Sequence, residues 1–329
     1  MAGVTGRVIL PTAAPAQPSA SGVGTAHAKV ILLGEHAVVH GAPAIALPVH
    51  SLTLQASATH TDRDLWIDSV LYRGPVADAP DLLAAPVTAL TATLRFVGAA
   101  ATGLSVRIDG EIPAERGLGS SAAVAAAIST AVARAHGVDL DPHEQFELIQ
   151  AAERVAHGTP SGLDARSVVS AAPMWFRAGQ AQPLPSAFGG VFVIADTGVH
   201  GRTREAVAGV AALKAAEPAR VAGILARIQQ HTEQAAADLA GDDRGALGAR
   251  MRDTHALLRE LTVSSPHLDR LVAAADTAGA LGAKLTGGGR GGCVLALADT
   301  DDDARRIAAA LRENGAERTW MLRPGDIAA

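Results

Sequence analysis

The chain has 329 residues, of which 48% are apolar, so it is long enough for two domains that each bury a core. The net charge is −5 and Lys and Arg form no cluster, which argues against a nucleic-acid-binding surface. With a single cysteine, Cys293, no intrachain disulfide can form, and no apolar run approaches the roughly 20 residues that cross a bilayer. We therefore expect a cytoplasmic protein without membrane contact.

In chain order, residues 1–22 are rich in Ala, Pro, Ser and Gly and predict a flexible leader. Apolar periodicity then predicts strands at 28–33, 42–58 and 104–108, a hairpin and loops at 59–80, and helices at 82–100, 120–136, 141–156 and from 161 to before Pro173.

The second half of the chain predicts strands within 174–194, with a Gly- and Pro-containing break at 179–190. Helices at 202–214, 218–240, 243–261 and 266–279 precede strands at 283–286 and 292–298, a helix at 302–314 and a strand at 318–323. The irregular order favours an α+β fold. We place the boundary in the break, giving an N-terminal domain at 23–185 and a C-terminal domain at 186–329.

A glycine loop followed by two hydroxyls gives the strongest local signal, in Pro113-Ala-Glu-Arg-Gly-Leu-Gly-Ser-Ser-Ala-Ala123. The free N–H groups and positive dipole end of the helix that follows attract phosphate. The chain lacks the Gly-Lys-Ser/Thr ending of a Walker motif. The alternative is that Ser caps the helix for stability alone.

A second motif, Ala28-Lys-Val-Ile-Leu-Leu-Gly-Glu-His-Ala-Val-Val-His-Gly41, places a charged pair at the end of a buried strand. Such strand ends bind ligands in many α/β folds. Zinc binding by His36 and His40 is the less favoured alternative, because glycines on each side argue against a helix.

A third motif, Glu153-Arg-Val-Ala-His-Gly-Thr-Pro-Ser-Gly-Leu-Asp164, holds two carboxylates on either side of a tight turn. One could hold Mg²⁺, which prefers oxygen ligands, and the other could accept a proton. Capping by Ser161 and a favourable charge–dipole contact of Asp164 would explain the same residues without function.

The fourth motif contains Lys284 and five glycines within Gly287–Gly292, between two predicted strands. A simple hairpin needs only one or two glycines, so we expect this backbone to lie against another group, as the second face of a ligand pocket. The chain has only three lysines (Lys29, Lys214 and Lys284) against 25 arginines. Lys284 is also compatible with an ordinary charge at a strand edge.

Together, the four motifs resemble the GHMP kinase superfamily and, within it, the mevalonate kinase branch. The resemblance covers about residues 22–298, in the family's order. It implies a ribosomal-protein-like N-terminal domain and a ferredoxin-like C-terminal domain. The implied reaction is phosphoryl transfer from ATP to the 5-hydroxyl of mevalonate, and a homodimer is compatible with the family.

The resemblance also implies roles for single residues. Asp164 takes the hydroxyl proton and Lys29 lies beside it, favouring the ionised carboxylate. Mg²⁺ is held by Ser121 and Glu153. The residues on the substrate side are Glu35, His36 and Thr197. The residues of the phosphate cradle are Glu115, Arg116, Gly117, Leu118, Gly119, Ser120 and Ser121, with Gly287 and Gly288 from the second glycine loop.

Two departures and three alternatives stay open. Glu115 and Arg116 stand where many relatives have small residues, and a carboxylate near phosphates is unfavourable unless it points away or pairs with Arg116. The adenine pocket has only a candidate segment, residues 60–75. The alternatives are a kinase for phosphomevalonate or another small alcohol, a ligand-binding protein without turnover, and a decarboxylase of the same superfamily.

Overall fold

The computed structural model describes residues 21–184 and 187–324, which form a mixed α+β fold. They group into two compact units. Among the described residues, the first unit contains 21–25 together with Gln55–Asp109 and Val124–Ala156, and the second contains Ala26–Leu54, Gly110–Ala123, 157–184 and 187–324. Residues 1–20 of the predicted leader and the boundary predicted at 185/186 lie outside the described residues, so those domain limits stay a prediction.

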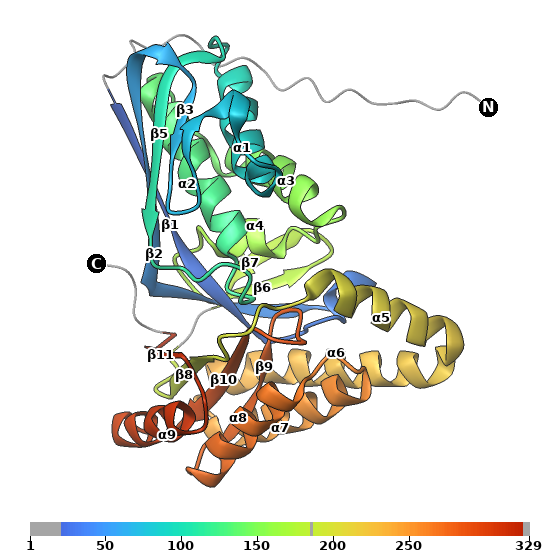
Figure 1. Ribbon diagram of the computed structural model, residues 1–329. Helices are drawn as coiled ribbons and strands as arrows, with labels where there is room; N and C mark the ends of the chain where they lie inside the picture. Colours follow the sequence, from blue (N-terminus) through green and yellow to red (C-terminus); the bar gives the residue numbers. More distant parts are fainter. Residues whose placement is uncertain (1–20, 185–186, 325–329) are drawn as a thin grey trace, which may run out of the picture. The chain divides into compact units, whose positions relative to one another are not determined.

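In the first unit, α-helices pack on one face of the strands (Figure 1). Strand order is β4-β3-β5-β2, with β3 parallel to β5 and antiparallel to β4. Helical spacing of apolar residues such as Leu90 and Leu94 places them in the core. The elements are β2 (Ala44–Asp64, second half), β3 (Trp66–Asp68), β4 (Arg73–Pro75), η2 (Val76–Asp78), η3 (Asp81–Leu83), α1 (Ala84–Phe96), β5 (Thr102–Gly110), α2 (Ser120–Ala135) and α3 (Pro142–His157).

The second unit begins with most of β1 (Ser21–Leu33), the short 3₁₀ helix η1 (Val38–His40) and the start of β2. Here β2 pairs antiparallel with β6 (Met174–Arg177), and β6 pairs antiparallel with β7 (Gln180–Pro183). The helix predicted from residue 161 to before Pro173 is wrong in length, because α4 spans only Leu163–Ser167. The chain leaves the helix where the Val168 carbonyl accepts a hydrogen bond from the His27 N–H of β1.

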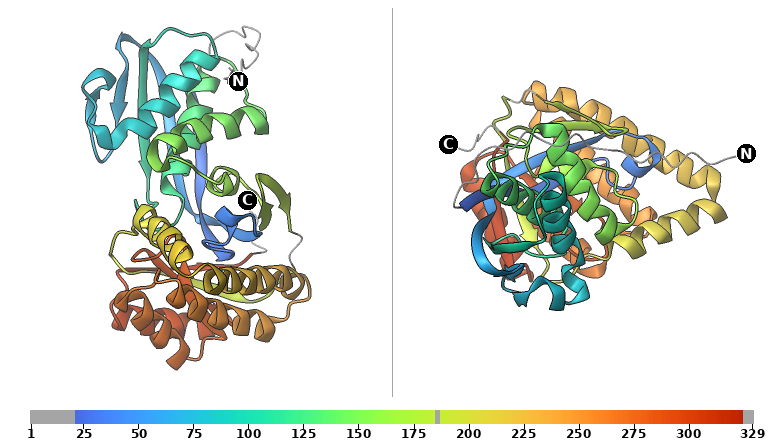
Figure 2. Two further views of the ribbon diagram at one scale, coloured as in Figure 1. Left: turned by 90° about the vertical axis from the view of Figure 1, so that its right-hand side faces the viewer. Right: turned by 90° about the horizontal axis from the view of Figure 1, so that it is seen from above.

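A four-stranded antiparallel sheet of order β11-β8-β10-β9 forms the rest of the second unit. Contacts of α7, α8 and α9 with these strands cover one face of the sheet, and α6 packs on α7 (Figures 1 and 2). The elements are β8 (Val191–Asp196), α5 (Thr203–Ala216), α6 (Pro218–Ala240), α7 (Arg244–Glu260), α8 (Pro266–Thr277), β9 (Gly282–Thr286), β10 (Cys293–Ala298), α9 (Asp301–Glu313) and β11 (Arg318–Leu322).

Alternation along β9 explains how this sheet presents polar groups to the site. Ala283 and Leu285 belong to the apolar core that the sheet forms with its helices. Because successive strand side chains point to opposite faces, Lys284 and Thr286 lie on the other face. There the Thr286 hydroxyl bridges the main chain of Ile31 in β1, at 3.0 Å from its N–H and 2.9 Å from its carbonyl.

Most predicted elements are confirmed within two to three residues. Three strands and one helix differ from the prediction. The strand predicted at 28–33 is wrong at its start, because β1 begins at Ser21 and includes residues 21–22 of the predicted leader. β2 continues to Asp64 into the segment predicted as hairpin and loop, β7 lies within the break predicted at 179–190, and α4 is short. In the described parts of the chain, no helix combines the length and apolarity needed to cross a bilayer.

Candidate functional site

The phosphate loop, which we define as residues 115–121, lies in the second unit and ends in the first turn of α2. Glu115, Gly117 and Gly119 have φ values of 58°, 76° and 74°, in the left-handed region that favours glycine. Leu118 accepts a hydrogen bond from the Lys29 N–H at 3.0 Å, which ties the loop to β1. A Cβ on Gly119 would come within 3.0 Å of the Lys29 Cγ, so the loop enters α2 beside Lys29.

Lys29 and Asp164 form an ion pair, with Nζ and Oδ1 2.9 Å apart. Lys29 reaches this position from β1 and Asp164 from the first turn of α4. The Lys29 side chain is 2% exposed, whereas that of Asp164 is 36% exposed, so the carboxylate stays open to a ligand. The expected neighbourhood of the two residues is confirmed, and their catalytic roles stay predictions.

Glu35 and Lys284 form a second ion pair, and both side chains are fully buried. Lys284 also donates to the Leu285 carbonyl at 2.6 Å, while Glu35 Oε2 has no hydrogen-bond partner within the described structure. Burial raises the pKa of Glu35 and lowers the pKa of Lys284, and each partner opposes the effect on the other. The alternative that Lys284 is an ordinary charge at a strand edge is therefore wrong, because its side chain is buried and paired with Glu35.

His36 and Thr197, predicted on the substrate side, are both buried against the second glycine loop. The His36 Nε2 lies 2.9 Å from the Gly288 carbonyl, and burial lowers the pKa of this imidazole to about 4. The neutral ring therefore donates through Nε2–H at neutral pH. The Thr197 hydroxyl donates to the Gly292 carbonyl at 2.7 Å.

The second glycine loop, residues 287–292, lies directly against the phosphate loop. A Cβ on Gly287 would come within 3.0 Å of the Gly117 Cα, and one on Gly292 within 2.8 Å of the Arg116 carbonyl oxygen. Side chains there would force the two backbones apart. These glycines therefore allow the two loops to pack closely on each other. Contact of the second glycine loop with a ligand stays a prediction.

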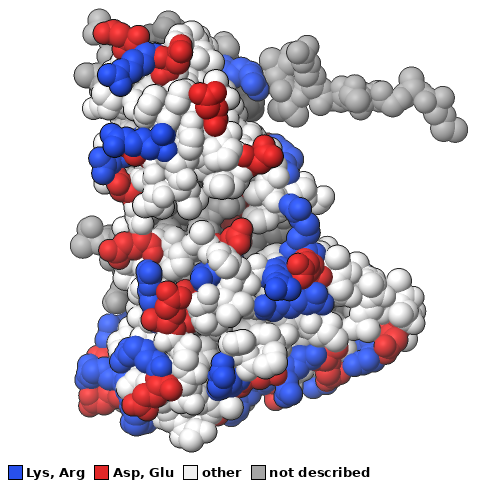
Figure 3. Space-filling model, viewed as in Figure 1, with Lys and Arg blue, Asp and Glu red and all other residues white. Residues whose placement is uncertain are grey.

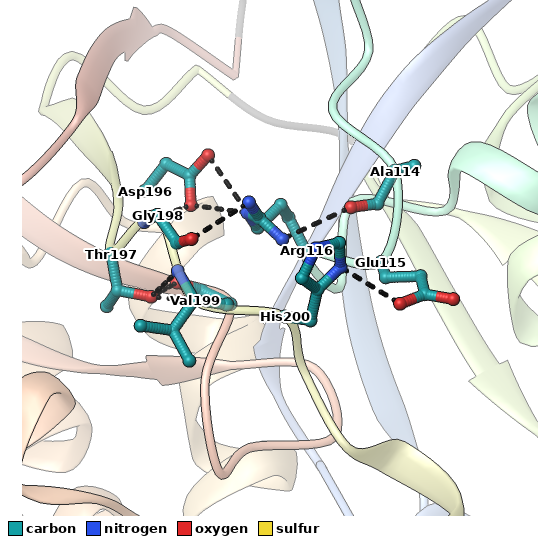
Figure 4. A network of polar contacts seen from close by, with 9 residues as sticks. Ala114, Glu115, Arg116, Asp196, Thr197, Gly198, Val199 and His200 are labelled. Carbon is teal, nitrogen blue, oxygen red and sulfur yellow. Dashed lines mark hydrogen bonds and ion pairs between the residues drawn. The ribbon is translucent and has the colours of Figure 1, made fainter. Parts of the chain in front are cut away.

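Arg116 joins the phosphate loop to the end of β8, as Figure 4 shows. Its Nε lies 2.9 Å from Asp196 Oδ1, and Nη2 donates to the Gly198 carbonyl at 3.0 Å. Burial raises the pKa of Asp196, opposed by the Gly198 N–H and by Arg116. Glu115 pairs with His200, with Oε2 and Nδ1 2.9 Å apart, and not with Arg116. The Glu115 carboxylate thus has a partner of its own, other than Arg116.

The two predicted Mg²⁺ ligands belong to different units. Ser121 lies in the first turn of α2, where its hydroxyl is 3.5 Å from His157 Nε2, and Glu153 is a buried residue of α3. Their hydroxyl and carboxylate oxygens are the donor types that Mg²⁺ accepts. The described residues contain no group of three or more His, Cys, Asp and Glu side chains able to form a cage for a metal.

Sequence reasoning missed Asp196 and Thr286 as organising residues of the site. Each is the last residue of a buried strand: Asp196 ends β8 after five apolar residues, and Thr286 ends β9, in which Lys284 is the one charged residue. A carboxylate or hydroxyl at the end of an otherwise apolar strand is the signal that identifies them, because a buried polar group needs a partner.

Charges on the visible surface are mixed. On the face drawn in Figure 3, Lys and Arg lie interspersed with Asp and Glu among the described residues, without a broad patch of one sign. The expectation that nucleic acid is not a partner stays a prediction.

Comparison with known families places two matches on the chain. Residues 85–171 match the profile described as GHMP kinases N terminal domain, and residues 235–317 match GHMP kinases C terminal. The chain is 33% identical over 299 residues to the mevalonate kinase of Thermococcus gammatolerans, covering 84% of this chain and 89% of that one. It is 32% identical to the mevalonate kinase of Pyrococcus furiosus, covering 89% and 93%.

Solved structures give the same result. The structure of L. major mevalonate kinase in complex with R-mevalonate superposes with a TM-score of 0.81 at 27% identity, covering 95% of this chain and 99% of that one. Mevalonate kinase from methicillin-resistant Staphylococcus aureus MRSA252 is 32% identical, with a TM-score of 0.69 and coverage of 94% and 100%.

Proposed function

The chain belongs to the GHMP kinase superfamily, in its mevalonate kinase branch, and we propose that it transfers the γ-phosphoryl group of ATP to the 5-hydroxyl of mevalonate. The observation that carries the proposal is the Lys29–Asp164 pair, in which a buried ammonium holds a carboxylate that remains exposed. A protein that only binds a ligand has no need of such a base. The product is 5-phosphomevalonate, on the route to isoprenoids.

In this mechanism Asp164 accepts the proton of the attacking hydroxyl. Lys29 keeps negative charge on the carboxylate favourable and presents a compact positive charge to the transferring phosphoryl group. Because the Lys29 main chain is bonded to Leu118, the base, the ammonium and the phosphate loop are held as one group. Phosphoryl transfer depends mainly on such positioning and charge neutralisation.

The backbone of residues 115–121 is proposed to bind the phosphates of ATP, assisted by the dipole of α2. Ser121 and Glu153 would hold Mg²⁺, which neutralises phosphate charge when bound. Two protein oxygen donors suffice in such sites, because Mg²⁺ takes its other ligands from water and the nucleotide.

Glu35, His36 and Thr197 are proposed to define the substrate side. His36 and Thr197 bond to the second glycine loop, so any substrate group they meet is recognised by a rigid surface. Glu35 is sealed against Lys284 and would act on the substrate side through the position of that pair. Discrimination against other small alcohols would come from these residues, whereas the phosphate loop would bind the nucleotide. Homodimerisation stays a prediction from the family.

The test is an assay of ADP release coupled to NADH oxidation, with mevalonate, phosphomevalonate, galactose and homoserine as acceptors. We expect turnover on mevalonate. Turnover on another acceptor with none on mevalonate would replace the substrate, and ATP binding without turnover on any of the four would favour a binding protein.

A further inference from the structure

Arg116 lies within the phosphate loop, where a guanidinium would be expected to reach for phosphate. Its side chain is instead only 11% exposed, and its donors face protein acceptors. Nε pairs with Asp196, Nη2 donates to the Gly198 carbonyl at 3.0 Å, and Nη1 donates to the Ala114 carbonyl at 3.4 Å. The guanidinium group therefore bonds to the protein itself.

We propose that Arg116 is a positioning residue for ATP: together with Asp196 its side chain fixes the phosphate loop in the shape that binds the nucleotide, without itself touching the phosphates. This inference rests on the proposed kinase activity. The geometry also identifies Asp196 as the fixed point, since its side chain is 2% exposed and its Oδ1 accepts the Gly198 N–H at 2.9 Å.

The loop needs an anchor because its backbone is costly to order. Glu115, Gly117 and Gly119 all have positive φ, and glycines lose more conformational freedom on ordering than other residues. A loop that is already ordered before ATP arrives loses less entropy on binding. The Arg116 side chain orders the loop by bonding it to Asp196, which lies 80 residues further along the sequence.

Two anchors hold the loop at different points. The Leu118 carbonyl is bonded to the Lys29 N–H, next to the ion pair with Asp164. Arg116 holds the other side of the loop, where its own carbonyl lies against Gly292. Loss of Arg116 should therefore loosen nucleotide binding while Lys29 and Asp164 remain in place.

A matched control exists in the same unit. Arg250 on α7 pairs with Asp238 on α6, with Nε and Oδ2 2.5 Å apart and side chains 25% and 9% exposed. The residue types and the degree of burial are similar to those of Arg116 and Asp196. Arg250→Gln thus reports what the loss of a half-buried Arg–Asp pair does to stability alone.

The experiment compares Arg116→Gln, Asp196→Asn, the double variant and Arg250→Gln, by steady-state kinetics, calorimetric ATP binding and thermal unfolding. For Arg116→Gln and for Asp196→Asn we expect the KM and Kd for ATP to rise by about 10- to 100-fold, with the KM for mevalonate changed less than about twofold. The double variant should be no worse than either single variant, because the two residues act as one pair. Arg250→Gln should lower the melting temperature without changing the KM for ATP.

Arg116→Lys serves as a second test if Arg116→Gln does not fold. An ammonium can reach Asp196 but cannot also bond both carbonyls, so we expect part of the ATP affinity to return. Unchanged ATP affinity in Arg116→Gln or Arg116→Lys, with a loss of stability like that of Arg250→Gln, would overturn the proposal. Weak ATP binding in Arg116→Gln with normal binding in Asp196→Asn would also overturn it and indicate direct contact with phosphate. Calorimetric ATP binding tests the inference even if mevalonate is not the acceptor.

Discussion

The second unit contains two lysine–carboxylate pairs that differ in their access to solvent. In the pair of Lys29 and Asp164, the carboxylate is 36% exposed, whereas Lys284 and Glu35 are both sealed from solvent. An exposed carboxylate can exchange its partner for a ligand or a proton. A sealed pair cannot do so without leaving a charge unpaired in the interior. The comparison separates a pair suited to chemistry from one suited to holding the segment that follows β1 against β9.

The largest expected effect comes from breaking the open pair on its exposed side. Asp164→Asn keeps the shape of the side chain but removes the base, and we expect kcat to fall by about 10²- to 10⁴-fold. Calorimetric ATP binding should change little, because the phosphate loop is untouched. Asp238→Asn is the control for loss of a carboxylate in an ion pair. Turnover that persists in Asp164→Asn would show that another group takes the proton.

Breaking the sealed pair should act on folding. Lys284→Met leaves Glu35 as an uncompensated buried charge, and we expect the free energy of unfolding to fall by about 3–5 kcal/mol in urea titrations. The double variant Lys284→Met/Glu35→Gln should recover much of this loss, since no charge remains. Lys29→Met should instead abolish activity and lower the free energy of unfolding by less than Lys284→Met does. Equal stability losses for Lys284→Met and Lys29→Met would remove the distinction between the pairs.

The two histidines beside the sealed pair predict a pH dependence of stability. Burial lowers the pKa of His36 and of His255 to about 4, below the ordinary value of 6.5. Between pH 6.5 and pH 4, both histidines are protonated in the unfolded chain but neutral in the folded protein. The free energy of unfolding is therefore unaffected by them above pH 6.5 and decreases as the pH falls towards 4. Each group would lower the free energy of unfolding by about 2 kcal/mol at pH 5.

The measurement is urea unfolding at pH 5, 6, 7 and 8. His255 accepts the Leu285 N–H at Nδ1, which requires the neutral ring. His255→Asn should therefore flatten the fall in stability between pH 7 and pH 5 while lowering stability at pH 7. A variant with the same slope as the parent would show that His255 is not the group that titrates.

The smallest effect is expected at the exposed pair of the phosphate loop. Glu115 and His200 are 70% and 66% exposed, and exposed ion pairs contribute less than about 1 kcal/mol. His200→Ala should leave thermal unfolding almost unchanged and alter the KM for ATP less than Arg116→Gln does. If His200→Ala raised the KM for ATP more than Arg116→Gln does, Glu115 and not Arg116 would be the main anchor of the loop.

Local sequence patterns predicted the elements well because helix and strand periodicity depends on near neighbours. The loop at 115–121, the helix start at Ser120 and the neighbourhood of Lys29 and Asp164 could all be expected from motifs and their resemblance to a family. The length of α4 was not predictable, because it ends where β1 takes the Val168 carbonyl. The extension of β2 to Asp64 depends in the same way on pairing with β5.

The sequence by itself determined most of the secondary structure, the family and the candidate residues for the chemistry, since these depend on composition, spacing and motifs. Only the tertiary structure decided which polar groups become partners. Lys284 meets Glu35 across 249 residues, and Arg116 meets Asp196 across 80. Such pairing follows from how strands and loops pack, because a buried charge must find its partner wherever the fold brings one. That requirement directs the Arg116 side chain out of the phosphate loop and towards Asp196.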